Sequence, residues 1–129
     1  WSLAALFLAN FIKSINFSYQ VDFKEHADTR KALLNLREIR SADQQDYFEI
    51  GKSKFMNATI NYYCFKEQLK FIPGADLKFC NEKGPYPYYY LFEEDIDCIS
   101  DLNLELIEFY PVSKTYLFRN PEYIKEHKN

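Results

Sequence analysis

Apolar and polar residues are unevenly distributed along this chain of 129 residues, and its N-terminal end is the most apolar part. The first charged residue is Lys13, and apolar residues continue to recur as far as Tyr19. As a helix, residues 1–19 would be about 28 Å long, close to the roughly 30 Å hydrocarbon core of a bilayer. We therefore predict a membrane-anchor helix over residues 1–19 and a single small hydrophilic domain over residues 20–129. The anchor side chains are Trp1, Leu3, Leu6, Phe7, Leu8, Phe11 and Ile12. A helix packed on another protein and a secretory remnant are the alternatives.

A pair of amphipathic helices is predicted after the anchor. In the first, Ala32, Leu33, Leu36 and Ile39 recur at helical spacing, and a residue at position 28 or 29 caps the start. A longer helix is predicted over residues 44–72, because apolar residues recur there at intervals of three, four and seven. A strand through residues 58–65 is the rival interpretation, since β-branched and aromatic residues are frequent in it. The Pro73-Gly74 pair is expected to end the element in either case.

The next segment, residues 81–92, is rich in aromatic residues and contains Pro85 and Pro87. These prolines exclude a helix and favour a turn followed by an extended stretch. So many aromatic rings exceed what a small core can bury, and tyrosine is enriched at protein interfaces. We therefore predict a contact with another protein through Tyr86, Tyr88, Tyr89, Tyr90 and Phe92.

The C-terminal part is acidic at first and mixed afterwards. Residues 93–108 contain seven acids and no base, and their leucines fit a half-buried strand as well as a helix. Pro111 is expected to end that element, and residues 116–129 to form a short docking segment with a frayed end. The predicted fold class is mainly α: a membrane-associated helix, an amphipathic helical pair, an extended aromatic segment and a short C-terminal element. An α+β fold is the alternative.

Charge and motif content exclude several classes of function. The net charge is −3 and no basic stripe is present, so nucleic acid is not an expected partner. No phosphate-binding or nucleophile motif occurs, and the chain has only three glycines. Residues 101–112 imitate the start of a calcium loop, but Leu106 and Val112 stand where that loop needs glycine and a bidentate acid. We predict no catalytic, cofactor-binding or metal-binding residue, and no enzyme activity of the chain itself.

Three cysteines, Cys64, Cys80 and Cys98, leave the redox setting open. Buried thiols are one interpretation, and one disulfide with a free thiol in an oxidising compartment is the other. The triplets beginning at Asn16 and Asn57 match the N-glycosylation sequon. Glycans at these sites and a disulfide would both be typical of a secreted chain.

No family is assigned from the sequence. The helix over residues 32–40 resembles those of the leucine-tyrosine-arginine proteins of mitochondria, but Asn35-Leu36-Arg37 replaces their signature tripeptide. From the architecture we predict a non-catalytic accessory subunit of a membrane-embedded complex. Its partners would be other protein subunits and membrane lipid, and a respiratory-type assembly of the mitochondrial inner membrane is one setting. The alternative is a secreted or lumenal binding domain with an aromatic-lined ligand pocket.

Overall fold

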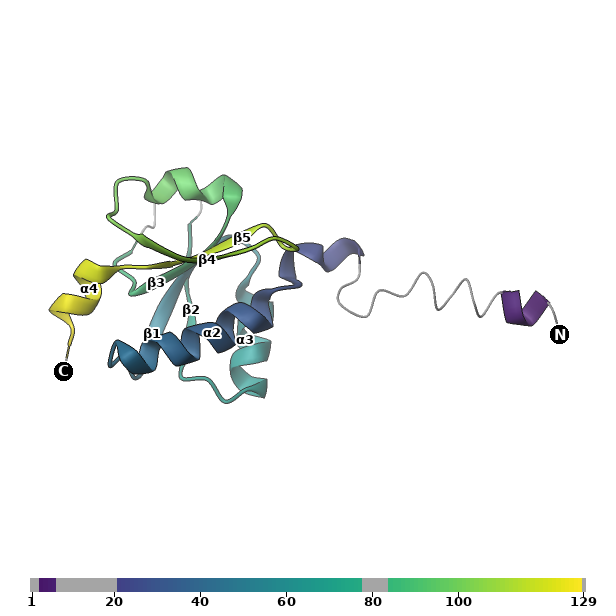
Figure 1. Ribbon diagram of the computed structural model, residues 1–129, viewed down its shortest axis with the longest axis horizontal. Helices are drawn as coiled ribbons and strands as arrows, with labels where there is room; N and C mark the ends of the chain where they lie inside the picture. The colour runs from purple at the N-terminus through teal and green to yellow at the C-terminus, as the bar shows by residue number, and fades with distance from the viewer. Residues whose placement is uncertain (1–2, 7–20, 78–83, 129) are drawn as a thin grey trace.

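The fold combines helices with one β-sheet (Figure 1). The computed structural model describes residues 3–6, 21–77 and 84–128, with the backbone alone for residues 21–23. Residues 3–6 form a short helical segment. The other elements are η1 (Val21–His26), α2 (Thr29–Ala42), β1 (Phe48–Lys52), α3 (Asn57–Lys66), β2 (Phe71–Asp76), β3 (Tyr88–Phe92), η3 (Glu93–Ile99), β4 (Glu105–Tyr110), β5 (Thr115–Arg119) and α4 (Pro121–Glu126). This is an α+β fold. The prediction of a mainly α chain is therefore wrong, and the alternative fold class is confirmed.

The sheet is mixed, with the strand order β2-β1-β3-β5-β4. Strand β1 pairs in parallel with β2 on one side and with β3 on the other. Strand β5 pairs antiparallel with both β3 and β4. Strand β3 therefore lies at the centre of the sheet, between strands of opposite direction. The two edge strands, β2 and β4, are more exposed than the central strand β3.

Both faces of the sheet are covered, which explains why β3 is apolar throughout (Figure 1). Helices α2 and α3 lie against one face, and η3 lies against the other. Because side chains alternate along a strand, Tyr88 and Tyr90 pack in the core beneath α2 and α3. Tyr89 and Leu91 pack on the opposite face, with Ile99 of η3.

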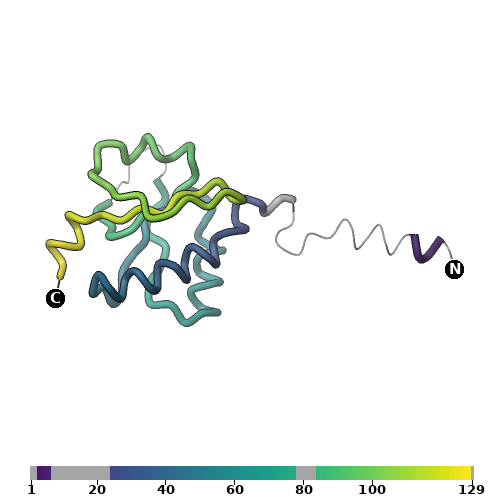
Figure 2. Tube along the Cα trace, in the orientation of Figure 1, coloured from purple at the N-terminus to yellow at the C-terminus, as the bar shows by residue number. Residues whose placement is uncertain are grey.

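The first predicted helix is present, as α2. Its buried residues include Ala32, Leu33 and Leu36, and Asp28 is its N-cap. The carboxylate of Asp28 makes no capping bond. It accepts hydrogen bonds from Ser113, in the turn of the β4–β5 hairpin. This contact joins the hairpin turn to the segment where η1 leads into α2. Figure 2 shows the two backbone segments close together.

The single helix predicted over residues 44–72 is wrong, since that range holds β1, α3 and the start of β2. Two residues with positive φ, Phe55 (68°) and Gln68 (53°), stand near the two ends of α3, and a helix cannot continue through that conformation. The apolar residues at intervals of three and four belong partly to the strand β1 and partly to the short helix α3. Pro73 and Gly74 end no helix; they lie within β2, and an edge strand tolerates proline.

The later segments also resolve into separate elements. The extended stretch predicted around Pro85 and Pro87 is present as β3. The acidic segment, for which strand and helix both fitted, contains η3 followed by β4, and β4 ends just before Pro111. The predicted docking tail forms β5 and α4. The side chain of Ile124 of α4 is buried in the core.

The predicted membrane anchor is described only at residues 3–6. Leu3 and Leu6 are 74% and 64% exposed there. The other predicted anchor residues lie outside the described part of the chain: Trp1, Phe7, Leu8, Phe11 and Ile12. Within the described residues, no helix has the length and apolar character needed to cross a membrane.

Candidate functional site

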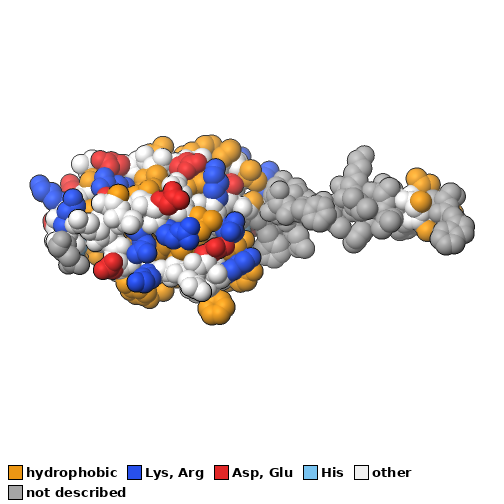
Figure 3. All heavy atoms as spheres, turned by 60° about the horizontal axis from the view of Figure 1, so that its bottom comes forward, with side chains coloured by type: hydrophobic (Ala, Val, Ile, Leu, Met, Phe, Trp, Pro, Cys, Tyr) orange, Lys and Arg blue, Asp and Glu red, His pale blue; other side chains and the backbone are white. Residues whose placement is uncertain are grey.

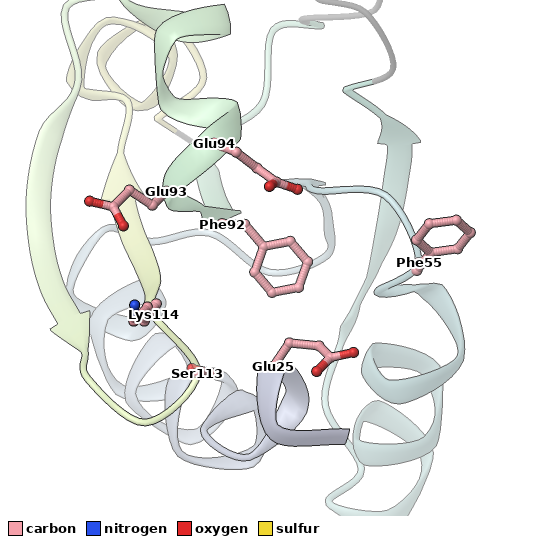
Figure 4. Close-up of a pocket in the computed structure, with 7 residues that line it drawn as sticks. All are labelled: Glu25, Phe55, Phe92, Glu93, Glu94, Ser113 and Lys114. Carbon is pink, nitrogen blue, oxygen red and sulfur yellow. The ribbon is translucent and has the colours of Figure 1, made fainter. Parts of the chain in front are cut away.

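A pocket of about 550 Å³ lies where η1, the end of β3, the start of η3 and the β4–β5 turn approach one another (Figure 4). Its lining combines aromatic rings, carboxylates and one lysine. The lining residues are Glu25, Phe55, Phe92, Glu93, Glu94, Ser113 and Lys114. A concave site with apolar walls and a few polar groups is the usual form of a small-ligand site.

The ring of Phe92 occupies the middle of this pocket (Figure 4). The carboxylates of Glu25 and Glu94 lie on either side of it, whereas Glu93 points away toward the side of Lys114. The ring also meets the edge of His26, with the ring centroids 6.5 Å apart. Phe92 is half-buried, and its inner part packs against the core beneath α2 and α3. The core therefore holds the ring while part of it remains accessible.

The charge of the pocket is negative. Three carboxylates face one ammonium among its lining side chains, which leaves a formal charge of −2. None of Glu25, Glu93 and Glu94 forms an ion pair within the described residues. Glu93 and Glu94 stand at the start of η3, where backbone N–H groups carry partial positive charge. These N–H groups offset only part of the negative charge of the pocket. The site thus offers unneutralised negative charge beside an aromatic face.

Two backbone outliers form the rim of the pocket. Phe55 and Lys114 have φ values of 68° and 52°, in the left-handed region that favours glycine. Non-glycine residues held there cost of order 1–3 kcal/mol, and such strain concentrates at binding and catalytic sites. The Phe55 side chain is 74% exposed, so burial does not explain its position. The ammonium of Lys54 lies 4.4 Å from the centroid of its ring.

A buried polar chain lies below the pocket at Ser113. The Ser113 hydroxyl donates to the Asp28 carboxylate at 2.9 Å and contacts the Thr115 hydroxyl at 2.7 Å. The Thr115 hydroxyl donates to the hydroxyl of Tyr90 at 2.9 Å. Burial raises the pKa of Tyr90, so its hydroxyl stays protonated at neutral pH. These bonds fix the hairpin turn, and with it Lys114, relative to α2 and β3.

A second pocket, of about 330 Å³, adjoins the first. The two share Phe55, Phe92 and Glu94, and the second adds Asp95 and Cys98. Together they form a continuous groove across the end of β3. Most of its acidic side chains come from the first turn of η3, and Glu25 comes from η1. The acidic run of the sequence therefore becomes part of a site.

The residues predicted to contact a partner lie mostly inside the domain. Tyr88, Tyr89 and Tyr90 are fully buried, and Tyr86 is 9% exposed. They pack in the two core layers, and a contact of these residues with another protein stays a prediction. Phe92 is the exception, because it faces the pocket.

Exposed aromatic side chains occur on α3 instead. Tyr62 is 56% exposed and Phe65 is 87% exposed. The face viewed in Figure 3 has apolar side chains standing out at its lower edge, while positive and negative charges are interspersed over the rest. No single-sign patch is visible on that face.

A second buried cluster lies near the C-terminal ends of α2 and β5. The carboxylate of Asp43 accepts a hydrogen bond from the Tyr88 hydroxyl at 2.5 Å and from Nε of Arg119 at 2.8 Å. Nη2 of Arg119 donates a second hydrogen bond to the Asp43 carboxylate and forms an ion pair with it. Burial acts to raise the pKa of Asp43, but these donors and the guanidinium charge outweigh it, so that pKa is lowered. Burial, together with Asp43, raises the pKa of Tyr88.

The cysteines differ in state. Cys98 is disulfide-bonded, and Cys64 is a free thiol on the buried face of α3. Burial raises the pKa of Cys64 to about 11, which leaves it protonated and weakly reactive. Cys80 lies outside the described residues. No group of three or more His, Cys, Asp or Glu side chains in the described part of the chain is arranged to hold a metal ion.

Comparison with models of protein families, with curated proteins and with solved structures finds no match for this chain. The pocket therefore has to be interpreted from its own chemistry. Sequence reasoning missed Glu25, Phe55, Glu94 and Lys114 as site residues. Pro111 marks the turn that carries Lys114, but no sequence signal joins that turn to residue 25 or 55.

Proposed function

We propose that this chain is a non-catalytic binding domain whose pocket takes up the cationic group of a small molecule or peptide. The observation that supports it most directly is the Phe92 ring, which lies between the carboxylates of Glu25 and Glu94. Neither carboxylate forms an ion pair with another described residue. A cation over an aromatic face is attracted by the ring quadrupole, by about 0.5–2 kcal/mol depending on desolvation. The two carboxylates are exposed, so they add a charge attraction that water weakens.

The proposed setting is an oxidising one, as in a secreted or lumenal domain. The disulfide at Cys98 supports it, because disulfides persist in such compartments and are rare where thiols are kept reduced. That disulfide also lies at the groove, since Cys98 lines the pocket next to Phe92 and Glu94. It would hold η3, and with it the acidic wall, in place.

The test is titration of the full chain with choline, followed by calorimetry and by NMR shifts of the Phe92 ring. Its neutral isostere 3,3-dimethylbutan-1-ol is the matched ligand control. We expect choline to bind and the alcohol to bind at least several-fold more weakly. Phe92→Leu keeps an apolar contact and removes the ring, and should weaken choline binding by about 2-fold to 30-fold.

Glu94→Gln should also weaken choline binding while leaving the alcohol unaffected. Glu122→Gln, on the exposed first turn of α4, is the control for a change of net charge. Equal binding of choline and the alcohol, or equal loss in Glu94→Gln and Glu122→Gln, would contradict a specific cation site.

A second candidate is an accessory role in a membrane-embedded complex. The exposed aromatic side chains of α3, Tyr62 and Phe65, favour it, because large apolar groups in water are typical of contact surfaces. Native electrophoresis of a mild-detergent extract tests this candidate. Migration in a large band would support it, and migration near 15.5 kDa would discard it.

A further inference from the structure

Beyond ligand binding, we propose that Asn57 is the acceptor of an N-linked glycan. The triplet Asn57-Ala58-Thr59 forms the first turn of α3. Asn57 and Ala58 are exposed, and Thr59 is half-buried. A sequon on the surface of a secreted protein is the usual acceptor of such a glycan.

Within the described part of the chain, the Asn57 side chain neither caps α3 nor forms a hydrogen bond. Asparagine stabilises a helix at the N-cap, where its oxygen accepts a backbone hydrogen bond. Here Met56 is the N-cap, and no side chain caps α3. The Asn57 amide makes no hydrogen bond within residues 24–77 and 84–128. Its nitrogen is therefore available to react, and a glycan there breaks no hydrogen bond among the described residues.

The disulfide at Cys98 is the independent observation, because it points to the same compartment. Disulfides form in the lumen of the endoplasmic reticulum, which is also where N-linked glycans are attached. This inference depends on that oxidising setting and is independent of what the pocket binds.

The reaction needs a lipid-linked oligosaccharyl diphosphate as co-reactant. The amide nitrogen Nδ2 of Asn57 forms a bond to the anomeric carbon of the first sugar. The bond from that carbon to the diphosphate oxygen breaks, and the lipid diphosphate leaves with the bonding electrons. One proton of the amide passes to a base of the transferase. No oxidation or reduction takes place.

The position of the glycan bears on the rim of the pocket. Asn57 follows Phe55 by two residues, and the Phe55 ring is 74% exposed. A bulky, solvated glycan at this point would lie beside an apolar ring that the fold does not bury. It would limit contacts between this rim and other proteins.

The test expresses the full chain behind a cleavable secretory leader in animal cells. Peptide N-glycosidase treatment in ¹⁸O-water followed by mass spectrometry maps the sites, because each released glycan leaves an ¹⁸O-labelled aspartate. We expect label at position 57, and a gel shift in the wild type that the enzyme removes. Peptide mapping also separates position 57 from the other sequon, at position 16.

Two variants of the sequon itself serve as a matched pair. Thr59→Ala should abolish label at position 57, and Thr59→Ser should retain it, although both shorten the same half-buried side chain. Asn57→Gln should behave like Thr59→Ala. An unlabelled position 57 in wild-type protein would overturn the proposal, as would label that persists in Thr59→Ala. Total cell lysate and medium are both analysed, so poor secretion of a variant does not affect the result.

Discussion

Replacement of Arg119 by Met removes the guanidinium that neutralises Asp43 and keeps the apolar stem of the side chain. The Asp43 side chain is 7% exposed and that of Arg119 is 30% exposed. After the substitution, Tyr88 is the remaining side-chain donor to this carboxylate among the described residues. A buried carboxylate then has to be kept in the fold with one side-chain hydrogen bond and with Lys128 as the remaining cation that acts on it among the described residues.

Breaking a buried pair by removing one partner costs about 3–5 kcal/mol. Water reaches Arg119 in part, and the bond from Tyr88 survives, so we expect about 2–3 kcal/mol for Arg119→Met. The ion pair of Arg119 with Glu105 adds little, because the Glu105 side chain is 58% exposed. Arg37→Met is the matched control, since Arg37 lies exposed on α2 and forms no ion pair in the described part. It should change stability by less than about 0.5 kcal/mol.

Urea unfolding followed by circular dichroism measures these changes, and a double-mutant cycle with Asp43→Asn isolates the pair. Asp43→Asn removes the charge and keeps an acceptor for Tyr88. We expect the double variant to be less destabilised than the sum of the single variants, by about 1–3 kcal/mol. Additive losses, or equal losses in Arg119→Met and Arg37→Met, would refute the reasoning.

The same carboxylate sets a dependence of stability on pH. The pKa of Asp43 is lower in the folded state than in the unfolded state, where it is about 3.9. The stabilisation is therefore fully present above pH 4 and is lost as the pH falls through the folded pKa. Wild-type stability should drop below about pH 4, and Asp43→Asn should show a smaller drop. Parallel pH profiles would count against the pair.

Two further substitutions test local geometry. Phe55→Gly should be more stable to urea than Phe55→Ala by about 1 kcal/mol, because glycine adopts the φ of 68° without strain. An alanine variant that is equally or more stable would exclude the left-handed turn. Gly51→Ala should destabilise the domain by about 1–3 kcal/mol, because the Cβ of the new alanine would lie 2.4 Å from Cδ1 of Tyr89 and 2.8 Å from Cδ2 of Tyr86. An unchanged urea midpoint would show that this face of the sheet packs less closely.

The sequence predicted elements best where one periodicity was unambiguous. Helix α2 has a polar face of charged residues, and no strand explains Ala32, Leu33 and Leu36 together. Between residues 44 and 72 the apolar spacing fitted a helix only because a strand, a short helix and another strand follow one another closely. The turn at Phe55 carries no glycine or proline to mark it, so the left-handed residue was invisible in the sequence.

The aromatic run illustrates a different limit. Its extended conformation followed from the prolines, but its burial did not follow from composition. Tyr88 and Tyr90 bury their hydroxyls by bonding Asp43 and Thr115, which lie far away in the chain. Tyrosine in a core is tolerated when each hydroxyl has a partner, and sequence alone names no partner. The pocket was unpredictable for the same reason, since Glu25, Phe92 and Lys114 meet only in the folded sheet.

The central place of β3 has a consequence for how the chain folds. Its neighbours β1 and β5 are formed by residues 48–52 and 115–119, so both pairings of β3 join distant parts of the chain. Sheets built from distant segments form slowly, on a scale of milliseconds to seconds. During synthesis β3 leaves the ribosome while β5 is still inside the exit tunnel, and until β5 emerges β3 has one open edge and an apolar surface. The nascent domain is therefore most prone to misassociate in this interval, and a chaperone acting on it should bind the segment around β3.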